Sequence, residues 1–537
     1  MVHSRWPTVF VAVMCLLISF PAFASPPEEA ASSARQGGKL IYGLTLSPSG
    51  IDPHVNASSE LGIPLTSVYD PLIWRTPDGD FVPGLAESWE ISSDGLIYTF
   101  HLRRDVTFHD GTPFDAQAVK VNLDRIVDPS TKSQKAAIML GSYAYTEIID
   151  RYTVRIVLHE PFAPLLDSLS QVYLAIASPA ALERWGIDYQ MHQVGTGPFE
   201  FKEYIPGDHL TLTAYADYNW PPGHFENQGR AYLDEVEFRF FPEPAVRALA
   251  LEGNEADVMG ELPPQDAQRL AKDPQFEIIP VPIPGQSLQI FLNTKRAPTD
   301  DLNVRQALLH ATDRDTIVRT IFRGYSPIAY GPLSANTIGF AEPLIGTYPF
   351  DLEKAKALLE KSGWTDSDGD GIREKDGRPL RLDGYFMTWG FLPEIATLLQ
   401  AQFVAAGIDL QTQTVAYPAA LDAARQGKHH LIPFNLSSSD PDILRTFFAS
   451  ENAASGFNWS KIEDPTLDRL LVEGARTMDT QKRLGIYEEV QQRVMDLALI
   501  LPIRDYVNIN AKSARVKNLQ YDARGWFPLL YDVYLEP

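Results

Sequence analysis

Hydrophobic and polar residues alternate in short runs along this chain, and the runs predict strands interleaved with amphipathic helices. Strict alternation predicts strands at residues 39–46, 98–102, 153–158 and 236–241. Apolar residues at helical spacing predict helices over residues 304–311 and 352–359. Because both element types recur from end to end, we expect an α/β or α+β fold.

Two aspartates in the C-terminal third have the position of helix N-caps. Asp464 is followed by proline, which favours the first position of a helix. Asp479 precedes a longer apolar periodicity that reaches Leu497, and we expect Pro502 to close this helix.

The N-terminus has the pattern of a cleaved signal peptide. Arg5 precedes the apolar run Val9–Phe20, and Ala22-Phe23-Ala24 gives the small-x-small cleavage pattern. The run is shorter than the ~20 residues that span a bilayer, and Cys15 lies inside it without the small residues of a lipid-attachment site. We therefore expect residues 1–24 to be removed, residues 25–38 to form a flexible leader, and the mature protein to be exported.

Length and charge narrow the class of protein. The 537 residues exceed what one hydrophobic core supports, so two or three domains are expected. With 46 basic and 69 acidic residues, the formal charge of −23 argues against a nucleic-acid partner. A single cysteine excludes a disulfide framework and a thiolate metal site.

The sequence contains no spaced cluster of catalytic groups. There is no nucleophile elbow, no H-E-x-x-H and no phosphate-binding P-loop. Gly195-Thr196-Gly197 is followed by Pro198, which favours a turn over a dinucleotide site. His429 and His430 point to opposite faces of an extended segment and share one ion poorly. We expect neither enzymatic activity nor a cofactor.

One acidic loop resembles the start of a calcium-binding loop. Asp366, Asp368 and Asp370 occupy positions one, three and five, with Gly371 at position six. Position twelve is Gly377, where a bidentate glutamate is required for tight binding. The loop is therefore a weak calcium candidate, and a polar turn between a helix and the strand near Leu380 is the alternative.

A long motif carries a family resemblance. It comprises residues 84–95, 98–103, 105–106 and 108–116, which read GLAESWEISSDG, YTFHLR, DV and FHDGTPFDA. Four later segments match the same family in the same order along the chain. They lie at residues 194–199, 303–308, 351–359 and 440–442, and the last is followed by a match at 458–460. From residue 39 to the C-terminus the chain resembles the family 5 extracellular solute-binding proteins of ABC importers, which include dipeptide, oligopeptide, nickel, haem and glutathione receptors.

The resemblance implies a two-lobed α/β periplasmic binding protein with an interlobe ligand cleft. Residues 39–285 and 500–537 would form the first lobe, with 76–190 as an extra subdomain, and residues 286–499 would form the second. Lobe closure would bury the ligand, and the closed form would deliver it to the membrane permease. The implied location is the periplasm, the implied partners are the ABC permease and ATPase subunits, and we expect a monomer.

The charge anchors of dipeptide receptors are missing at the matching positions. Ser437 stands where the resemblance implies an aspartate for the ligand ammonium, and Pro393-Glu394 where it implies an arginine pair for the carboxylate. A zwitterionic dipeptide would therefore bind poorly, since unpaired buried charges are costly. A longer peptide or a peptide-like solute is still a possible ligand, as are a glycoside, an opine or a metal chelate such as nickel. A cationic group on the ligand would suit Glu394 and the negative net charge of the chain.

The resemblance and the residue types together suggest cleft residues. Ser47, Ser49 and His54 follow the first strand, and Trp389 has a ring suited to stacking or to the core. The run Ser437, Ser438, Ser439 and Asp440 would face them, with a turn or helix cap as the alternative for Asp440. An exported sensor, chaperone or hydrolase on the same fold is the competing functional class.

Overall fold

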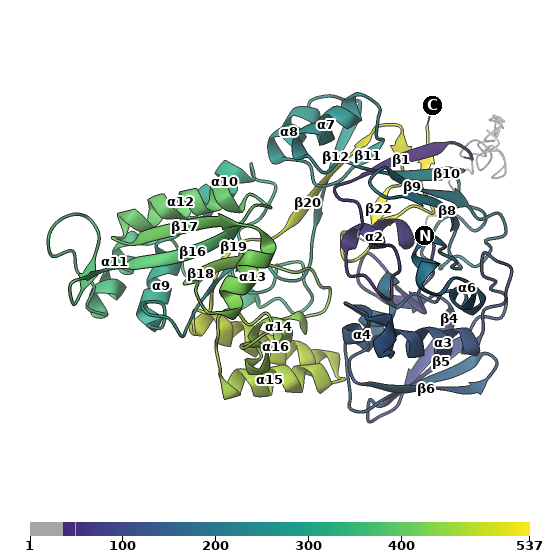
Figure 1. Ribbon diagram of the computed structural model, residues 1–537, viewed down its shortest axis with the longest axis horizontal. Coiled ribbons are helices and arrows are strands. Elements are labelled where there is room, and N and C mark those ends of the chain that lie inside the picture. Colours follow the sequence, from purple (N-terminus) through teal and green to yellow (C-terminus); the bar gives the residue numbers. More distant parts are fainter. Residues whose placement is uncertain (1–35, 49, 537) are drawn as a thin grey trace, which may run out of the picture.

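The computed structural model describes residues 36–48 and 50–536, and its two largest sheets lie in two separate lobes (Figure 1). The seven-stranded sheet has the order β12-β20-β11-β1-β10-β9-β8. Its strands are β1 (Lys39–Leu44), β8 (Phe199–Ile205), β9 (His209–Ala214), β10 (Glu235–Phe240), β11 (Val258–Met259), β12 (Phe276–Pro282) and β20 (Val507–Ser513). The five-stranded sheet has the order β17-β16-β18-β13-β19. Its strands are β13 (Leu288–Leu292), β16 (Arg381–Met387), β17 (Asp409–Val415), β18 (Leu431–Phe434) and β19 (Ile500–Arg504).

A four-stranded antiparallel sheet of order β4-β5-β7-β6 lies within the segment expected as a subdomain. It consists of β4 (Ala86–Ile91), β5 (Ile97–Leu102), β6 (Tyr143–Asp150) and β7 (Thr153–Leu158). Four small pairs complete the strands, namely β2 (Ile73–Arg75) with β3 (Phe81–Pro83), β14 (Glu374–Lys375) with β15 (Arg378–Pro379), β21 (Val516–Lys517) with β24 (Tyr534–Leu535), and β22 (Gln520–Tyr521) with β23 (Pro528–Leu529).

Helices accompany the sheets in both lobes. Those of the first lobe are α2 (Ser59–Leu65), α3 (Ala116–Val127), α4 (Ala136–Met139), α5 (Leu165–Leu169), α6 (Pro179–Trp185), α7 (Pro244–Glu252) and α8 (Pro264–Leu270). Those of the second are α9 (Leu302–His310), α10 (Arg314–Ile321), α11 (Leu352–Lys361), α12 (Leu392–Ala405), α13 (Tyr417–Arg425), α14 (Ile443–Phe448), α15 (Pro465–Arg476) and α16 (Thr480–Asp496). The mixed α/β architecture expected from the sequence is confirmed.

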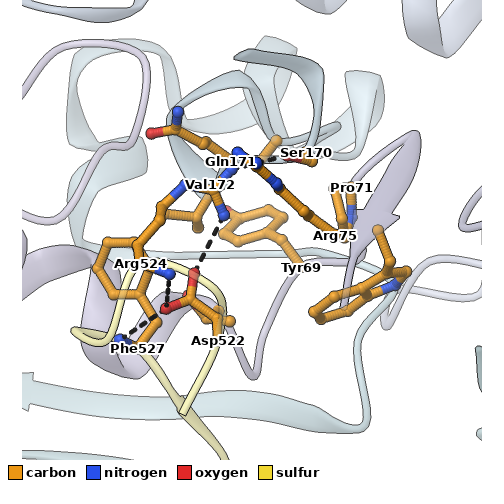
Figure 2. Close-up of a pocket in the computed structure, with 12 residues that line it drawn as sticks. Tyr69, Pro71, Arg75, Ser170, Gln171, Val172, Asp522, Arg524 and Phe527 are labelled. Atoms are coloured by element: carbon orange, nitrogen blue, oxygen red, sulfur yellow. Dashed lines mark hydrogen bonds and ion pairs between the residues drawn. The ribbon is translucent and has the colours of Figure 1, made fainter. Parts of the chain in front are cut away.

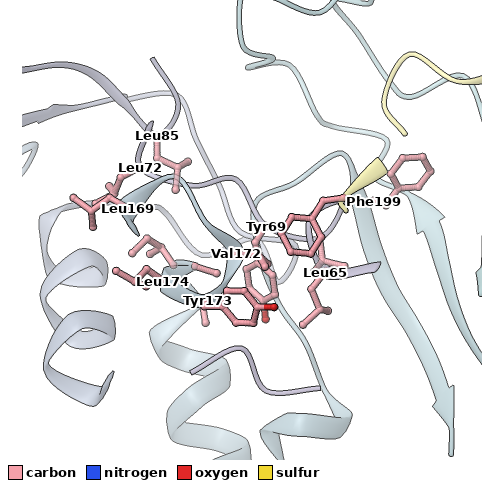
Figure 3. Packing of buried hydrophobic residues seen from close by; sticks show 14 of the residues in the cluster. Leu65, Tyr69, Leu72, Leu85, Leu169, Val172, Tyr173, Leu174 and Phe199 are labelled. Carbon is pink, nitrogen blue, oxygen red and sulfur yellow. The ribbon is translucent and has the colours of Figure 1, made fainter. Parts of the chain in front are cut away.

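Separate hydrophobic cores divide the lobes. One core draws its buried residues from 288–503, while the others draw theirs from 40–270 and from 507–533. Figure 3 shows part of the first-lobe core, where Tyr69 and Tyr173 pack among leucines and near Phe199. Since no member is shared, each lobe is stabilised by its own burial of apolar surface.

The chain crosses between the sheets twice, at neighbouring points. One crossing runs from β12 to β13 and the other from β19 to β20. The two crossings run side by side. On the first-lobe side β12 pairs with β20, with Pro282 opposite Val507. On the second-lobe side β13 pairs with β19, with Leu288 opposite Arg504. Residues 500–504, which the sequence analysis assigned to the first lobe, are therefore a strand of the second. The helix expected to close at Pro502 ends at Asp496.

Local chemistry explains the predicted helix starts and one turn. The side chains of Asp464 and Asp479 accept hydrogen bonds from the backbone N–H groups of Leu467 and Lys482, as expected of N-caps. Gly195 lies so close to residue 68 that a Cβ would stand 2.1 Å from the Val68 carbonyl oxygen. The glycine permits this backbone approach just before β8, so the segment is a turn.

Within residues 36–48 and 50–536, no helix combines the length and apolar character needed to cross a membrane.

Candidate functional site

The two crossings identify the edge of the second sheet that faces the first lobe. β13 begins there and β19 ends there, because both connect directly to first-lobe strands. β18 runs antiparallel to β13, so β18 ends at the edge where β13 begins. β16 and β17 run parallel to β18. The carboxyl ends of β16, β17 and β18 therefore meet at this same edge. Ligands of open α/β sheets bind beyond such carboxyl ends. The segments that leave these strands therefore form the second-lobe side of the candidate site.

Aromatic rings cover this edge around Phe434, the last residue of β18. The ring of Trp389, which follows β16, meets Phe434 edge-on at 6.3 Å and 76°. The ring of Tyr417, which begins α13 after β17, stacks on Phe434 at 5.9 Å and 20°. Trp459 packs on it from the core at 4.8 Å. Trp389 is 39% exposed and Phe434 only 6%, so Trp389 is a partly exposed ring that rests on a buried one.

The segment after β18 divides into residues with different roles. Ser437 is exposed and forms an antiparallel bridge with Gly285 in the first crossing. The Ser438 hydroxyl donates to the Asp440 carbonyl and accepts from its N–H, which closes a local turn. Asp440 forms a two-pronged ion pair with Arg483 at 2.6 and 2.8 Å, so its carboxylate is already paired within the second lobe.

Ser439 connects the two lobes. Its hydroxyl donates to Asp167 of the first lobe at 2.6 Å, and both residues are buried. Two further contacts lie nearby, a backbone hydrogen bond from Ala163 to Ala475 and an ion pair between Glu160 and Arg476. The lobes therefore meet through several polar contacts, together with Met478, which packs against the first-lobe core.

Asp167 is the centre of a buried charge network on the first-lobe side. Its Oδ1 accepts from Arg75 at 2.5 Å and from Arg524 at 3.2 Å, and its Oδ2 accepts from Gln171 at 3.0 Å. Burial alone would raise the pKa of this carboxyl, but Arg524, Arg75 and the Ser439 hydroxyl together lower it. Asp167 is thus held ionised where Ser439 reaches it.

Arg524 extends the network toward the C-terminus. It donates to Asp522 at 3.0 Å and to Ser170 at 2.7 Å. Figure 2 shows Arg524 and Asp522 beside Tyr69, with Arg75 and Gln171 on the other side of the same cavity. This cavity measures about 20 Å³, enough for roughly one water molecule and too small for a solute. The network is therefore a structural support beneath the lobe interface.

The loop after β1 departs partly from expectation. Ser47 is exposed, and its hydroxyl lies 3.1 Å from the Tyr204 hydroxyl and accepts from the Gly207 N–H. Ser49 lies outside the described residues. His54 is 1% exposed, with Nε2 on the Ala175 carbonyl and Nδ1 against Arg125. His54 is therefore a buried residue of the first lobe and is not retained as a cleft residue.

The network around Asp167 was not anticipated from the sequence. Arg75 and Arg524 lie 92 and 357 positions from Asp167 along the chain. No spacing pattern connects groups so far apart, and each residue alone is an ordinary surface type. Only the fold brings them together.

The acidic loop before β14 gathers its carboxylates as the sequence suggested. Oxygens of Asp366, Asp368 and Asp370 lie within 4.8 Å of one another and of a fourth carboxylate, Glu374. Glu374 stands at position nine of the loop, which the sequence analysis did not count. These side chains are exposed or half-buried, and several accept backbone N–H bonds of their own turn, so the loop is also stable as a polar turn.

The histidine pair is structural. His429 Nε2 contacts the Trp459 carbonyl at 2.7 Å, and His430 Nε2 the Ala297 carbonyl at 2.9 Å. Burial lowers the pKa of His429 to about 4, so this imidazole stays neutral.

Comparison with known proteins gives this architecture a context. Residues 80–455 match the family described as Bacterial extracellular solute-binding proteins, family 5 Middle. The nickel-binding periplasmic protein of Escherichia coli K12 is 26% identical over 526 residues, covering 96% of this chain and 95% of that protein. The glutathione-binding protein GsiB of Salmonella choleraesuis is 30% identical over 438 residues, covering 81% and 82%. The crystal structure of NikA from Brucella suis in complex with Fe(III)-EDTA superposes with a TM-score of 0.83 at 26% identity, covering 93% of this chain and all of that one.

Proposed function

The chain belongs to the family 5 bacterial extracellular solute-binding proteins, and from that premise we propose that it captures a peptide or peptide-like polar solute in the periplasm. Members of this family are the substrate-binding components of ABC importers, and this chain is one of them. The proposed cycle is capture between the lobes, closure, and delivery to the permease, with the ATPase supplying the energy of transport.

The single observation that carries the closing step is the hydrogen bond between Ser439 and Asp167. It joins lobes that have separate cores and that, in the described part of the chain, are connected by two neighbouring crossings, an arrangement suited to hinge motion. A solute that contacts both faces shifts the equilibrium toward the closed form by its differential affinity. No covalent chemistry is needed, and we expect no turnover on a panel of peptides and glycosides.

The nature of the solute is the open part of the proposal. Relatives are named for nickel and for glutathione, and a related structure holds Fe(III)-EDTA. Glutathione and EDTA carry carboxylates, and two of the three names include a metal ion, so a non-peptide metal chelate is the second candidate. A glycoside or an opine would use the same supported ring, Trp389.

We propose Ser47, Trp389 and the segment Ser437–Ser439 as cleft residues. Ser47 and Ser437 are exposed, and Trp389 is partly so. Ser439 acts by joining the lobes, and Ser438 by shaping its turn. Asp440 is proposed as a structural residue, because Arg483 already pairs with it.

The experiment is to export the full chain, purify it without refolding, and identify any co-purified solute by mass spectrometry. Intact mass of the same sample tests cleavage after Ala24; a retained N-terminus or an added lipid contradicts it. A peptide or chelate released on denaturation, whose re-addition to solute-free protein reduces the radius of gyration, supports capture by closure. Reproducible turnover, or a solute that binds without compaction, contradicts the proposal.

A further inference from the structure

Lys135 immediately precedes α4, which lies on the side of the first lobe that faces the second (Figure 1). Its Nζ stands 3.7 Å from the centre of the Tyr173 ring. Across residues 36–48 and 50–536, the amine makes no hydrogen bond and no ion pair besides this ring contact, although Asp167 and Arg524 are close enough to act on its charge. A half-buried ammonium without an acceptor is unusual, because its three donors need partners when water is withdrawn.

The surrounding charges leave Lys135 as the surplus cation. Asp167 pairs with Arg75 and Arg524, and Asp522 pairs with Arg524. Two carboxylates are thus matched by two guanidinium groups, and none is left for the lysine. Burial and the nearby Arg524 lower the pKa of the Lys135 amine to about 8, and Asp167 opposes this shift.

We propose that Lys135, seated on the Tyr173 ring, anchors a carboxylate of the bound solute. The inference rests on the proposed function and deepens it, since it assigns a negative group to the transported molecule. The half-buried amine has donors that no carboxylate of the described residues accepts, so an anionic group of a solute can take that place. A carboxylate restores the missing charge-assisted hydrogen bonds, while the aromatic ring continues to shield the other side of the amine.

This anchor changes the expected charge of the solute. In the second lobe, Pro393-Glu394 stands where the family resemblance implies an arginine pair for the ligand carboxylate. Glu394 is negative, so this lobe by itself favours a cationic solute. Lys135 supplies a cation from the opposite lobe. A molecule with a free carboxylate, such as a peptide or an amino-acid chelate, therefore regains a partner for its negative end.

The site has a definite pH dependence. The charged and aromatic groups that act on the amine are Arg524 from the C-terminal segment, Asp167 from α5 and Tyr173. With a pKa of about 8 the amine is mostly charged at neutral pH and loses its proton as the pH rises through that value. Carboxylate binding is therefore strongest near neutral pH, weakens as the amine loses its proton above it, and weakens in acid as the carboxylate is protonated.

The test uses sodium acetate as the probe. Lysines of the full mature chain are labelled by ¹³C reductive methylation, and the Lys135 signal is assigned from its absence in Lys135→Arg. The Lys135 pKa is then followed with acetate, with acetamide at the same concentration, and with chloride at equal ionic strength. The exposed neighbour Lys132 is the internal control.

Acetate is expected to raise the Lys135 pKa by roughly half a unit or more, with no comparable change for acetamide or at Lys132. Equal responses to acetate and acetamide, or equal responses at both lysines, overturn the inference. Acetate binding and solute capture are independent results. A positive acetate result together with a solute that binds without compaction keeps the anion site and contradicts capture by closure. Capture of a solute with compaction but without an acetate effect keeps the proposed function and overturns the anion site.

Discussion

The two surfaces that meet at the Ser439–Asp167 hydrogen bond are built in opposite ways. The first-lobe side is a buried network of charges, in which Asp167 pairs with Arg75 and Arg524, while Lys135 forms no ion pair. The second-lobe surface is a group of rings around Phe434. Charged networks depend on every member, whereas ring packing tolerates the loss of an exposed member. The difference predicts a solute with an anionic end for one lobe and a flat or apolar portion for the other.

Removing the charge at the centre of the first-lobe network should have the largest effect. Asp167→Asn leaves Arg75 and Arg524 without their shared carboxylate in a buried site. We expect a loss of about 3–5 kcal/mol in the free energy of unfolding, as for other broken buried pairs. Urea unfolding measures it, with the exposed Asp78→Asn as the matched control. A loss no greater than that of the control would show that the network is not cooperative.

Removing the link between the surfaces should affect closure more than stability. Ser439→Ala deletes one hydrogen bond to a carboxylate, a contact of roughly 1.5–3 kcal/mol. The closed population and the affinity for the co-purified solute should both fall, as measured by small-angle scattering and calorimetry. Ser438→Ala is the control, because that hydroxyl bonds only to the backbone of Asp440. Equal effects of the two variants would contradict a closing role for Ser439.

The ring surface is tested by Trp389→Ala. Because the ring is 39% exposed, we expect stability to change by less than about 1 kcal/mol. The affinity for the solute should weaken by about 1–3 kcal/mol if the ring stacks on it. Calorimetry and thermal unfolding are compared with Phe350→Ala, an exposed ring that precedes α11. A stability loss typical of a core aromatic, with affinity unchanged, would assign Trp389 to the core.

Calcium should give the smallest effect, because the acidic loop lies in neither surface. If Asp366, Asp368, Asp370 and Glu374 bind the ion at about 1 mM, roughly 5 mM calcium adds about 1 kcal/mol of stability. Thermal unfolding with calcium, with magnesium and with Asp368→Asn measures it. Identical melting temperatures in all three conditions would leave the loop as a polar turn.

Sequence reasoning succeeded where the signal is local. Asp464 and Asp479 cap the helices that their positions predicted, and the alternating runs became β1, β5, β7 and β10. It failed at residues 500–504, because a short, fully buried apolar run fits the end of a helix and a buried strand equally well. In the candidate site, the place of Trp389 just after a strand was predicted, while its role as a cleft residue stays a prediction. The Asp167 network was not predicted, because its members are distant in sequence and no local pattern connects them.

The position of β20 has a consequence for the order of folding. This strand comes from residues 507–513, yet it lies inside the seven-stranded sheet, between β12 and β11. The first lobe therefore cannot complete its sheet, or bring Arg524 to Asp167, until the C-terminal segment joins it. The second lobe is built from the continuous segment 288–504 and needs no distant partner. We expect the second lobe to fold first and the Arg524–Asp167 network of the first lobe to form last, because long-range pairing is slow.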